Sequence, residues 1–599
     1  MAVSSALSPW EYVVAGLSLV ISISIGLVYA LKRDSSASTE RFLMGGRDLP
    51  LLPTAFSLLS SLVSAISLLS FPAEIYRMGS AFCWSVLGVC GALAFVAVFI
   101  VPVMYQVKSE SFYHYLEERF DSLGLRLYGA LSFALYACVY MALALYAPAV
   151  AFAGVSGAPT WILIISLGLV CTAYTSLGGL SAVVWTDAFQ TVVMYAGSIA
   201  LVVLGVSAVG GIPEVWEANS RFGRLDGFTD FDVNPFQHIN VWLAAFGTFF
   251  IWAAGFSNQI ALQRYRSMSS VGKAQRMAFV TIPCLLAVNL LVYAIGFIMF
   301  AYYRHCDPLT RGAVSSADQI VIFFMVDVLG KVPGLTGLFV ACLFSGTLST
   351  VSSGINSLTA VTFAELKRLG IRIPKEQSVH VAKLLGVFFG LFTIGMAFLC
   401  EPLGGILRAL NSLIGALFGP LFALFSLGIM TTFGNRKGAI AGTAVGFVVI
   451  FWIFIGSNIH RPTNPPLPLS TNGCAMALPR RIEHILETTT QSIISSTTTI
   501  WPDRSALTTT WEWVGQQLVT LYSLSYFAFA MTSFVVSFTV GVAVSWMTGR
   551  SDVCKRKPHL VYWSNRRLLR ERRGLGDNHE SPRDIVQQRN VSETSEVRV

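Results

Sequence analysis

Long runs of apolar residues separated by short polar connections fill almost the whole chain. About 20 consecutive apolar residues cross a bilayer as a helix, and the short alternating segments typical of membrane β-barrels are not seen. The pattern therefore predicts an all-α polytopic membrane protein with about thirteen transmembrane helices. The predicted spans are residues 10–32, 51–77, 79–106, 126–155, 158–177, 182–209, 239–262, 277–303, 333–363, 379–400, 404–432, 437–457 and 519–547.

Composition and charge agree with this class. Of the 599 residues, 54% are hydrophobic and only 12% are charged, whereas soluble domains carry about 25% charged residues. The net charge of +9 comes from basic connections and a basic tail. Such basic segments are attracted to anionic lipid headgroups, so we expect membrane lipids as partners and no nucleic acid.

The basic connections also predict the orientation. Lys and Arg concentrate in residues 32–47, 264–276 and 367–375 and in the C-terminal tail, which thirteen spans would place on one side. The positive-inside rule makes that side cytoplasmic, with Arg264 as a cytoplasmic anchor. The N-terminus is then extracellular and the C-terminus cytoplasmic. No basic region precedes the first span, so we do not interpret it as a cleaved signal peptide.

Residues 57–79, SLLSSLVSAISLLSFPAEIYRMG, are unusually rich in serine for an apolar span. Four of the serines share one helix face because they are spaced by three, four and three residues: Ser57, Ser60, Ser64 and Ser67. Pro72 lacks an amide hydrogen and disfavours a continuous helix. Serine also lets helices pack closely, which is the simpler explanation for any one of these residues. As a set, they predict an easily interrupted helix that is polar on one side.

A second polar helix strengthens this interpretation. Within residues 343–361, LFSGTLSTVSSGINSLTAV, one face carries Ser345, Ser349, Ser352 and Asn356. Hydroxyl oxygens and the carbonyls released by an interrupted helix suit a hard cation, and secondary transporters bind Na⁺ in this way. Neither polar face contains an acidic or basic residue, which argues against a proton relay. We therefore interpret the serines of residues 57–67 as one wall of an ion site.

Several ordered motifs make the chain similar to the sodium/solute symporter family over roughly residues 10–550. They include GGRDLPLLPTAFSLLSSLVSA (45–65), YTSLGGLSAVVWTDAFQ (174–190), NQIALQRY (258–265) and PGLTGLFVACLFSGTLSTVSSGINSL (333–358). The late stretches LPLSTNGC (467–474) and LYSLSYFAFAMTSF (521–534) resemble the branch that carries iodide, monocarboxylates and water-soluble vitamins.

The resemblance implies a leucine-transporter-like core within a membrane transporter domain of residues 1–550. Two inverted five-helix repeats would cover about 49–209 and 239–432, with the first span and the last two spans as additions. Carried over by motif, the sodium ligands would be the carbonyls of Ser60, Val63 and Gly346 and the hydroxyls of Ser349 and Thr350.

The implied function is Na⁺-coupled import of a small organic anion across the plasma membrane by alternating access. No buried Lys or Arg is evident near the break, so bound Na⁺ and the N-terminus of the half-helix beyond a break near Ser67 would attract the anion. Residues expected at the substrate or a second sodium are Ser64, Ser67 and Tyr146. We expect a monocarboxylate or vitamin carboxylate ahead of iodide, and a sugar last.

Other interpretations stay open. An iodide symporter, or a Na⁺-linked channel or sensor on the same fold, would share these motifs. An enzyme is not expected, because no nucleophile–base pair or metal cluster explains a reaction at membrane depth. Asp187 can serve as a gate or as a helix-capping charge, and Asn258 and Gln259 are expected to have structural roles.

The polar segments carry the remaining expectations. Residues 458–518 are predicted to form an extracellular loop, and residues 551–599 a basic, disordered cytoplasmic tail. The last residues, 597–599, could bind a PDZ-like domain through the terminal carboxylate. Cys306 and Cys474 fall in predicted external loops and could pair, because that compartment is oxidising.

Overall fold

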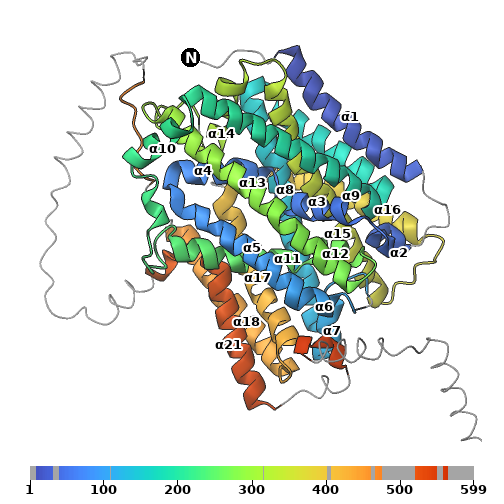
Figure 1. Ribbon diagram of the computed structural model, residues 1–599. Coiled ribbons are helices and arrows are strands. Elements are labelled where there is room, and N and C mark those ends of the chain that lie inside the picture. The colour runs from blue at the N-terminus through green and yellow to red at the C-terminus, as the bar shows by residue number, and fades with distance from the viewer. Residues whose placement is uncertain are drawn as a thin grey trace, which may run out of the picture.

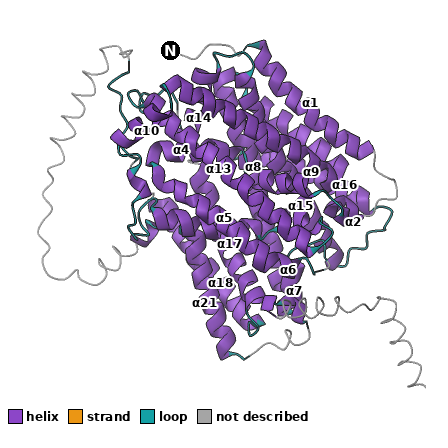
Figure 2. Cartoon of the chain, viewed as in Figure 1, coloured by secondary structure: helices purple, strands orange, loops and turns teal. Residues whose placement is uncertain are grey.

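The computed structural model (Figure 1) describes residues 8–31, 39–107, 109–314, 316–400, 406–460, 466–474, 520–549 and 557–563. Within these ranges the chain is helical and contains no strand (Figure 2). Ten helices are long and apolar enough to cross a membrane, and one bent pair brings the number to eleven. The all-α polytopic class predicted from the sequence is confirmed.

The apolar helices follow the predicted spans closely. They are α1 (Pro9–Leu31), α3 (Leu51–Leu62) with α4 (Ala65–Met78), α5 (Ser85–Phe95) with α6 (Val101–Met104), α8 (Leu123–Ser156), α9 (Thr160–Val209), α11 (Thr248–Phe256) with α12 (Gln259–Arg266), α13 (Val271–Tyr303), α15 (Leu335–Arg368), α16 (Ser378–Ala397), α17 (Ile406–Met430), α18 (Arg436–His460) and α21 (Phe529–Met547). Shorter helices connect them: α2 (Thr39–Met44), α7 (His114–Phe120), α10 (Ile212–Arg221) and α14 (Ala317–Leu329).

Helix α9 accounts for two predicted spans at once. Its 50 residues would extend about 75 Å as one straight helix, more than twice the hydrocarbon thickness of about 30 Å. Gly179 interrupts it with φ 65° and ψ −165°, a conformation that only glycine adopts readily. A side chain there would also collide with the ring of Phe42 on α2, 2.5 Å from the position of the added carbon. A count of about thirteen spans is therefore compatible with the fold.

The first helix of each predicted repeat is broken. The helices α3 and α4 meet at an angle of 60°, and the break lies at Val63 and Ser64. Pro72 lies inside α4. The interruption therefore falls about two helical turns before this proline and about one turn before Ser67. Helices α11 and α12 are separated at Ser257 and Asn258, a break that the apolar run 239–262 did not predict.

Helix α15 forms the centre of the packed core. It lies against α9, α8, α1 and α3, and its residues from Phe339 to Val361 are buried throughout. The accessory helices α18 and α21 pack side by side at one edge of the molecule (Figure 1). This arrangement places the serine-rich face of α15 next to the break between α3 and α4.

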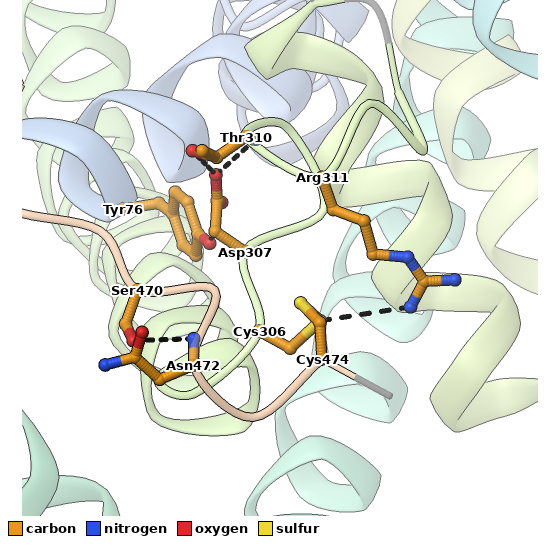
Figure 3. Close-up of a disulfide and its surroundings, with 8 residues drawn as sticks. All are labelled: Tyr76, Cys306, Asp307, Thr310, Arg311, Ser470, Asn472 and Cys474. Carbon is orange, nitrogen blue, oxygen red and sulfur yellow. Dashed lines mark hydrogen bonds between the residues drawn. A yellow bond between two sulfur atoms is a disulfide. The ribbon is translucent and has the colours of Figure 1, made fainter. Parts of the chain in front are cut away.

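A covalent and polar cluster ties the loops at one end of the molecule. Cys306, after α13, forms a disulfide with Cys474, which answers the question of pairing that the sequence left open. Figure 3 shows the neighbouring Asp307, whose carboxylate accepts hydrogen bonds from Tyr76 and Thr310. We call this end of the molecule the disulfide side.

Part of the predicted disordered tail is packed. Leu560 and Val561 are fully buried, and the Leu560 carbonyl accepts a hydrogen bond of 3.0 Å from the Tyr115 hydroxyl on α7. Because these backbone and side-chain groups have partners, the prediction of disorder is wrong for residues 557–563. The rest of the tail, including 597–599, and most of the predicted loop 458–518 lie outside the described residues.

Candidate functional site

The break between α3 and α4 is built from local backbone geometry. Val63 (φ −89°, ψ 100°) and Ser64 (φ −100°, ψ 177°) are extended, and the Ser64 hydroxyl accepts a hydrogen bond of 3.2 Å from the Ile66 amide. This is the N-cap arrangement that satisfies a free donor of a new helix. Ser64 therefore acts as the cap of α4.

Helix α15 approaches this break very closely. A Cβ added to Gly346 would lie 2.7 Å from the amide nitrogen of Ala65, so only glycine permits the contact. Ser349 then reaches across: its hydroxyl donates to the Ser60 carbonyl at 2.8 Å and lies 3.3 Å from the Gly346 carbonyl. The two serine-rich segments recognised in the sequence thus meet at the break.

Five oxygen-bearing residues predicted for sodium gather around this crossing. Ser60, Gly346 and Ser349 are joined by the contacts above, and Val63 lies in the break itself. The hydroxyls of Ser60 and Thr350 are buried and have no hydrogen-bond partner among the described residues. A buried hydroxyl without a partner costs about 1–3 kcal/mol. A small cation that accepts oxygen ligands would remove this cost at Thr350.

A buried ion pair contacts α3 at Ser57, about one turn further from the break than Ser60. Arg264 of α12 and Asp187 of α9 are 3.3 Å apart, and both side chains are 0% exposed. The Asp187 carboxylate also accepts a hydrogen bond of 2.5 Å from Ser57, and the Arg264 guanidinium donates to Ser353. The expectation of Arg264 as a cytoplasmic anchor is therefore corrected, since it pairs with a carboxylate inside the protein.

The interpretation of Asp187 as a charge at the start of a span is also corrected. Asp187 lies about two turns after the break of α9 at Gly179. Its carboxylate is hydrogen-bonded to Ser57 of α3, which is 130 residues earlier in the sequence. Short helix α12 supplies another link, because Gln263 accepts hydrogen bonds from Asn356 and Ser357 of α15. Charged and amide groups thus join α3, α9, α12 and α15, further from the break than the predicted sodium residues.

The structural roles expected for Asn258 and Gln259 are confirmed. The Asn258 side chain accepts a hydrogen bond of 3.2 Å from the Ala261 amide and caps α12. Gln259 bonds to the backbone of Phe112 and of Glu110, both at 2.7 Å. These contacts hold the second broken helix against the segment before α7.

A cavity of about 60 Å³ lies beside the break, on the side of α4. Its wall combines aromatic and aliphatic side chains with a few hydroxyl and amide groups, and no charged residue lines it among those that the structure describes. The lining includes Ser67 but neither Ser64 nor Tyr146. Tyr140, about two turns before Tyr146 on α8, reaches the cavity instead and donates to the Leu62 carbonyl at 3.2 Å. The polar lining residues are Ser67, Ser85, Tyr136, Tyr140, Thr248 and Asn411.

Known proteins are similar over most of the chain. The chain is 37% identical over 565 residues to a sodium-dependent multivitamin transporter of Oryctolagus cuniculus, covering 94% of this chain and 86% of the relative. It is 36% identical to sodium-coupled monocarboxylate transporter 1 of Homo sapiens, and the match covers 90% of this chain and 87% of the relative. A solved Na⁺-coupled sialic acid symporter, 22% identical, matches the fold with a TM-score of 0.71 over 90% of this chain and 98% of that one.

The family model for sodium:solute symporters matches residues 42–446, which contain both broken helices, the predicted sodium residues and the buried ion pair. Those relatives are transporters and not enzymes, and their transport depends on Na⁺. From the broken helices, the oxygen-rich crossing and these similarities together, the chain belongs to the sodium:solute symporter family.

Proposed function

We propose that this symporter couples Na⁺ to the uptake of a small monocarboxylate, which it holds in the cavity beside the α3–α4 break. The observation that carries the proposal is the position of this cavity. Leu62 before the break and Ile66 and Ser67 after it line the cavity, and the predicted sodium residues lie at the same break. A carboxylate there would lie between a bound cation and the N-terminus of a helix.

The electrostatics of the cavity favour an anion without fixing the rest of the substrate. The first backbone amides of a helix are free donors, and the helix dipole adds partial positive charge at that end. The lining has no charged residue that would repel or neutralise the anion. A neutral sugar gains little from such a dipole, which places it last among the candidates.

The size of the cavity favours a short acid. One water needs at least about 10–15 Å³ of such space, so a cavity of about 60 Å³ holds about four to six waters. A lactate-like acid, with three carbons and three oxygens, is close to this size, whereas a vitamin carboxylate needs the cavity to open further. Iodide is also small enough for the cavity, and the uptake experiment below distinguishes it from lactate.

We place the disulfide side outside the cell. Disulfides persist in oxidising compartments, and Cys306 lies just beyond one end of α13 while Lys273 and Arg276 lie at the other end. Lys367 and Arg368 end α15, and Glu11 of α1 contacts the opposite end of α15 at Gly334. The N-terminal end of α1 is then extracellular, in agreement with the positive-inside rule, and the membrane is the plasma membrane.

In this orientation, opening of the Asp187–Arg264 pair would release the ion and the acid inward. The pair joins α9 and α12, and the hydroxyls of Ser57 and Ser353 attach α3 and α15 to it. Because both charges are completely buried, they separate only when water or another partner reaches them. The sodium site and the Asp187–Arg264 pair both involve α3 and α15. Binding of Na⁺ can therefore change how readily the pair opens.

The driving force depends on the number of Na⁺ ions. At about −60 mV with a tenfold gradient, each Na⁺ supplies about 1.4 kcal/mol from concentration and about 1.4 kcal/mol from potential. One Na⁺ with a monoanion moves no net charge and supports about tenfold accumulation. Two Na⁺ carry one net charge and support about a thousandfold accumulation. Uptake accompanied by inward current would therefore indicate more than one Na⁺.

The test is uptake by the purified protein in proteoliposomes from a panel of lactate, pantothenate, biotin, iodide, glucose and proline, with Na⁺ or choline outside. The proposal predicts Na⁺-dependent uptake of lactate, with weaker uptake of the larger acids. Uptake of glucose alone, or lactate uptake that is unchanged in choline, contradicts it. Na⁺-dependent uptake of iodide alone would keep the symport mechanism and replace the substrate.

A further inference from the structure

An aromatic side chain from outside the two predicted repeats closes one wall of the cavity. Phe527 lines the cavity and is 2% exposed. It belongs to the short segment of residues 524–528 directly before α21. The carbonyl oxygen of Phe527 packs against Gly247, where an added Cβ would lie only 2.4 Å from it. The segment is thus held tightly against the N-terminal end of α11.

Phe527 continues an aromatic wall on the disulfide side of the cavity. Its ring centroid lies 5.8 Å from that of Phe82, and Phe82 lies 5.1 Å from Phe71 on α4. Both of these residues also line the cavity. Rings at such distances pack favourably and exclude water. Three aromatic rings therefore form one wall of the cavity.

Residues 235–238 hold the Phe527 segment in place. The Ser525 hydroxyl donates to the His238 carbonyl at 2.7 Å, and the Ser525 amide donates to the Pro235 carbonyl at 3.1 Å. The His238 ring centroid lies 5.3 Å from Tyr526 and 6.4 Å from Phe527. Backbone and ring contacts thus connect His238 to the lining residue.

His238 is in turn bound to the broken helix. Its Nε2 lies 2.5 Å from the Glu74 carboxylate, and Glu74 is 8% exposed. Glu74 shares a face of α4 with Ser67 and Phe71, because the three are spaced by four and three residues. Helix α4 therefore presents Ser67 and Phe71 to the cavity and Glu74 to the residue that packs on Phe527.

We propose that Phe527 sets the upper length of the transported acid, and that Glu74 and His238 are positioning residues that hold it over the cavity. This inference rests on the proposed monocarboxylate function. The physical reason is volume: a longer chain of the acid has to occupy the space of the Phe527 ring. When α4 moves, the Glu74–His238 contact moves the aromatic wall with it.

Uptake of straight-chain monocarboxylates from acetate to octanoate tests the length limit. Each buried methylene contributes about 0.8 kcal/mol, or about a fourfold change in kcat/KM. Phe527→Ala should therefore raise the hexanoate-to-acetate ratio of kcat/KM by at least about tenfold, mainly through KM for hexanoate. Phe527→Leu should shift the ratio less and in the same direction, and it keeps an apolar side chain if the alanine variant folds poorly.

Phe534→Ala is the matched control. Phe534 lies on α21 and contacts Phe250 and Phe422, and it is not among the residues that line the cavity. Its substitution should leave the hexanoate-to-acetate ratio unchanged. If Phe527→Ala and Phe527→Leu alter all chain lengths by one common factor, Phe527 does not select by length and the proposal is wrong.

A double-mutant cycle tests the positioning residues. Glu74→Ala should shift the length ratio in the direction of Phe527→Ala but by a smaller factor, and the combined variant should show no larger shift than Phe527→Ala alone. Non-additivity of this kind is expected for residues that act through one another. A merely structural role would lower transport of every acid and leave the ratio as it is, and that result would contradict the positioning role.

A labelling measurement tests the wall without reference to any substrate. Cells that express Phe527→Cys or Phe534→Cys are treated from outside with a membrane-impermeant thiol reagent, with the wild type as background. Phe527→Cys should react faster than Phe534→Cys, because the wall opens to the outside during the cycle. Absence of reaction at Phe527→Cys overturns the proposal. If that cysteine reacts while the wild type takes up no acid, the proposed monocarboxylate substrate is wrong, and the position of Phe527 in a wall that opens outward is supported.

Discussion

The two ends of the transport pathway are closed by different chemistry. On the side of α3, a single pair of fully buried charges, Asp187 and Arg264, holds four helices together with hydroxyl partners. On the disulfide side, aromatic packing closes the cavity, the Cys306–Cys474 bond ties the loops, and the Arg224 guanidinium donates to the Pro468 carbonyl at 2.6 Å. Separating a buried ion pair costs several kcal/mol because each charge is left without its partner, whereas the packed rings determine the shape of the space that they enclose. The first closure therefore suits a gate and the second a boundary that selects by shape.

The largest expected effect is at the buried pair. Arg264→Ala leaves the Asp187 charge buried without a positively charged partner, and breaking such a pair costs about 3–5 kcal/mol. We expect uptake to fall by at least about a hundredfold and the thermal stability of the detergent-solubilised protein to drop. The double variant Asp187→Asn with Arg264→Gln should recover stability but not gating. Near-normal uptake by Arg264→Ala would contradict the gate.

The next effect concerns the sodium crossing. Ser349→Ala and Thr350→Ala each remove a side-chain oxygen that a hard cation would use. We expect the Na⁺ concentration for half-maximal uptake to rise by about tenfold, corresponding to about 1.4 kcal/mol, with normal surface expression. Thr347→Ala is the matched control, because Thr347 donates to the Ala144 carbonyl on α8 instead. Wild-type Na⁺ dependence in both Ser349→Ala and Thr350→Ala would remove these residues from the site.

A smaller effect is expected inside the cavity. Tyr140→Phe removes a hydroxyl that lines the cavity and donates to the Leu62 carbonyl beside the break. A neutral hydrogen bond contributes about 1 kcal/mol, so KM for lactate should rise by about fivefold. Tyr146→Phe provides the comparison, since Tyr146 is not among the lining residues. Equal effects of the two substitutions would show that the tyrosines were assigned incorrectly.

The smallest effect on transport is expected at the disulfide. Replacing Cys306 and Cys474 by serine removes a link between positions 168 residues apart, and native disulfides typically stabilise by about 2–4 kcal/mol. Thermal stability should fall, whereas turnover at low temperature should change by less than about threefold. The Asp307 amide still donates to the Ser470 carbonyl, and the Arg224 guanidinium to the Pro468 carbonyl, so residues 466–474 remain attached. A loss of transport as large as that of Arg264→Ala would make the two closures equivalent and refute the contrast.

The sequence predicted the membrane class and the crossing because both depend on strong local patterns. Apolar runs of about 20 residues define the spans, and the spacing of Ser60 and Ser349 on their helices placed two polar faces in the core. The family motif then supplied the ligand set. The contact from Ser349 to the Ser60 carbonyl shows that the two faces meet.

The parts that the sequence did not predict depend on distant partners or on single backbone angles. Average apolarity over residues 239–262 cannot reveal a break at Ser257 and Asn258, although Asn258 is a typical capping residue. Arg264 lies in a short helix at the end of an apolar run, and only the fold shows that Asp187, 77 residues earlier, lies beside it. Phe527 lies in a span outside the repeats, so no periodicity connects it with the cavity.

The most direct test of the central claim is the Na⁺ dependence of lactate uptake in proteoliposomes that contain the wild type, Ser349→Ala, Thr350→Ala or Thr347→Ala. If Na⁺ at the α3–α15 crossing drives monocarboxylate uptake, the wild type and Thr347→Ala share one Na⁺ saturation curve. The other two variants then require about tenfold more Na⁺. Lactate uptake that proceeds equally in choline, or one saturation curve for all four proteins, would contradict the account.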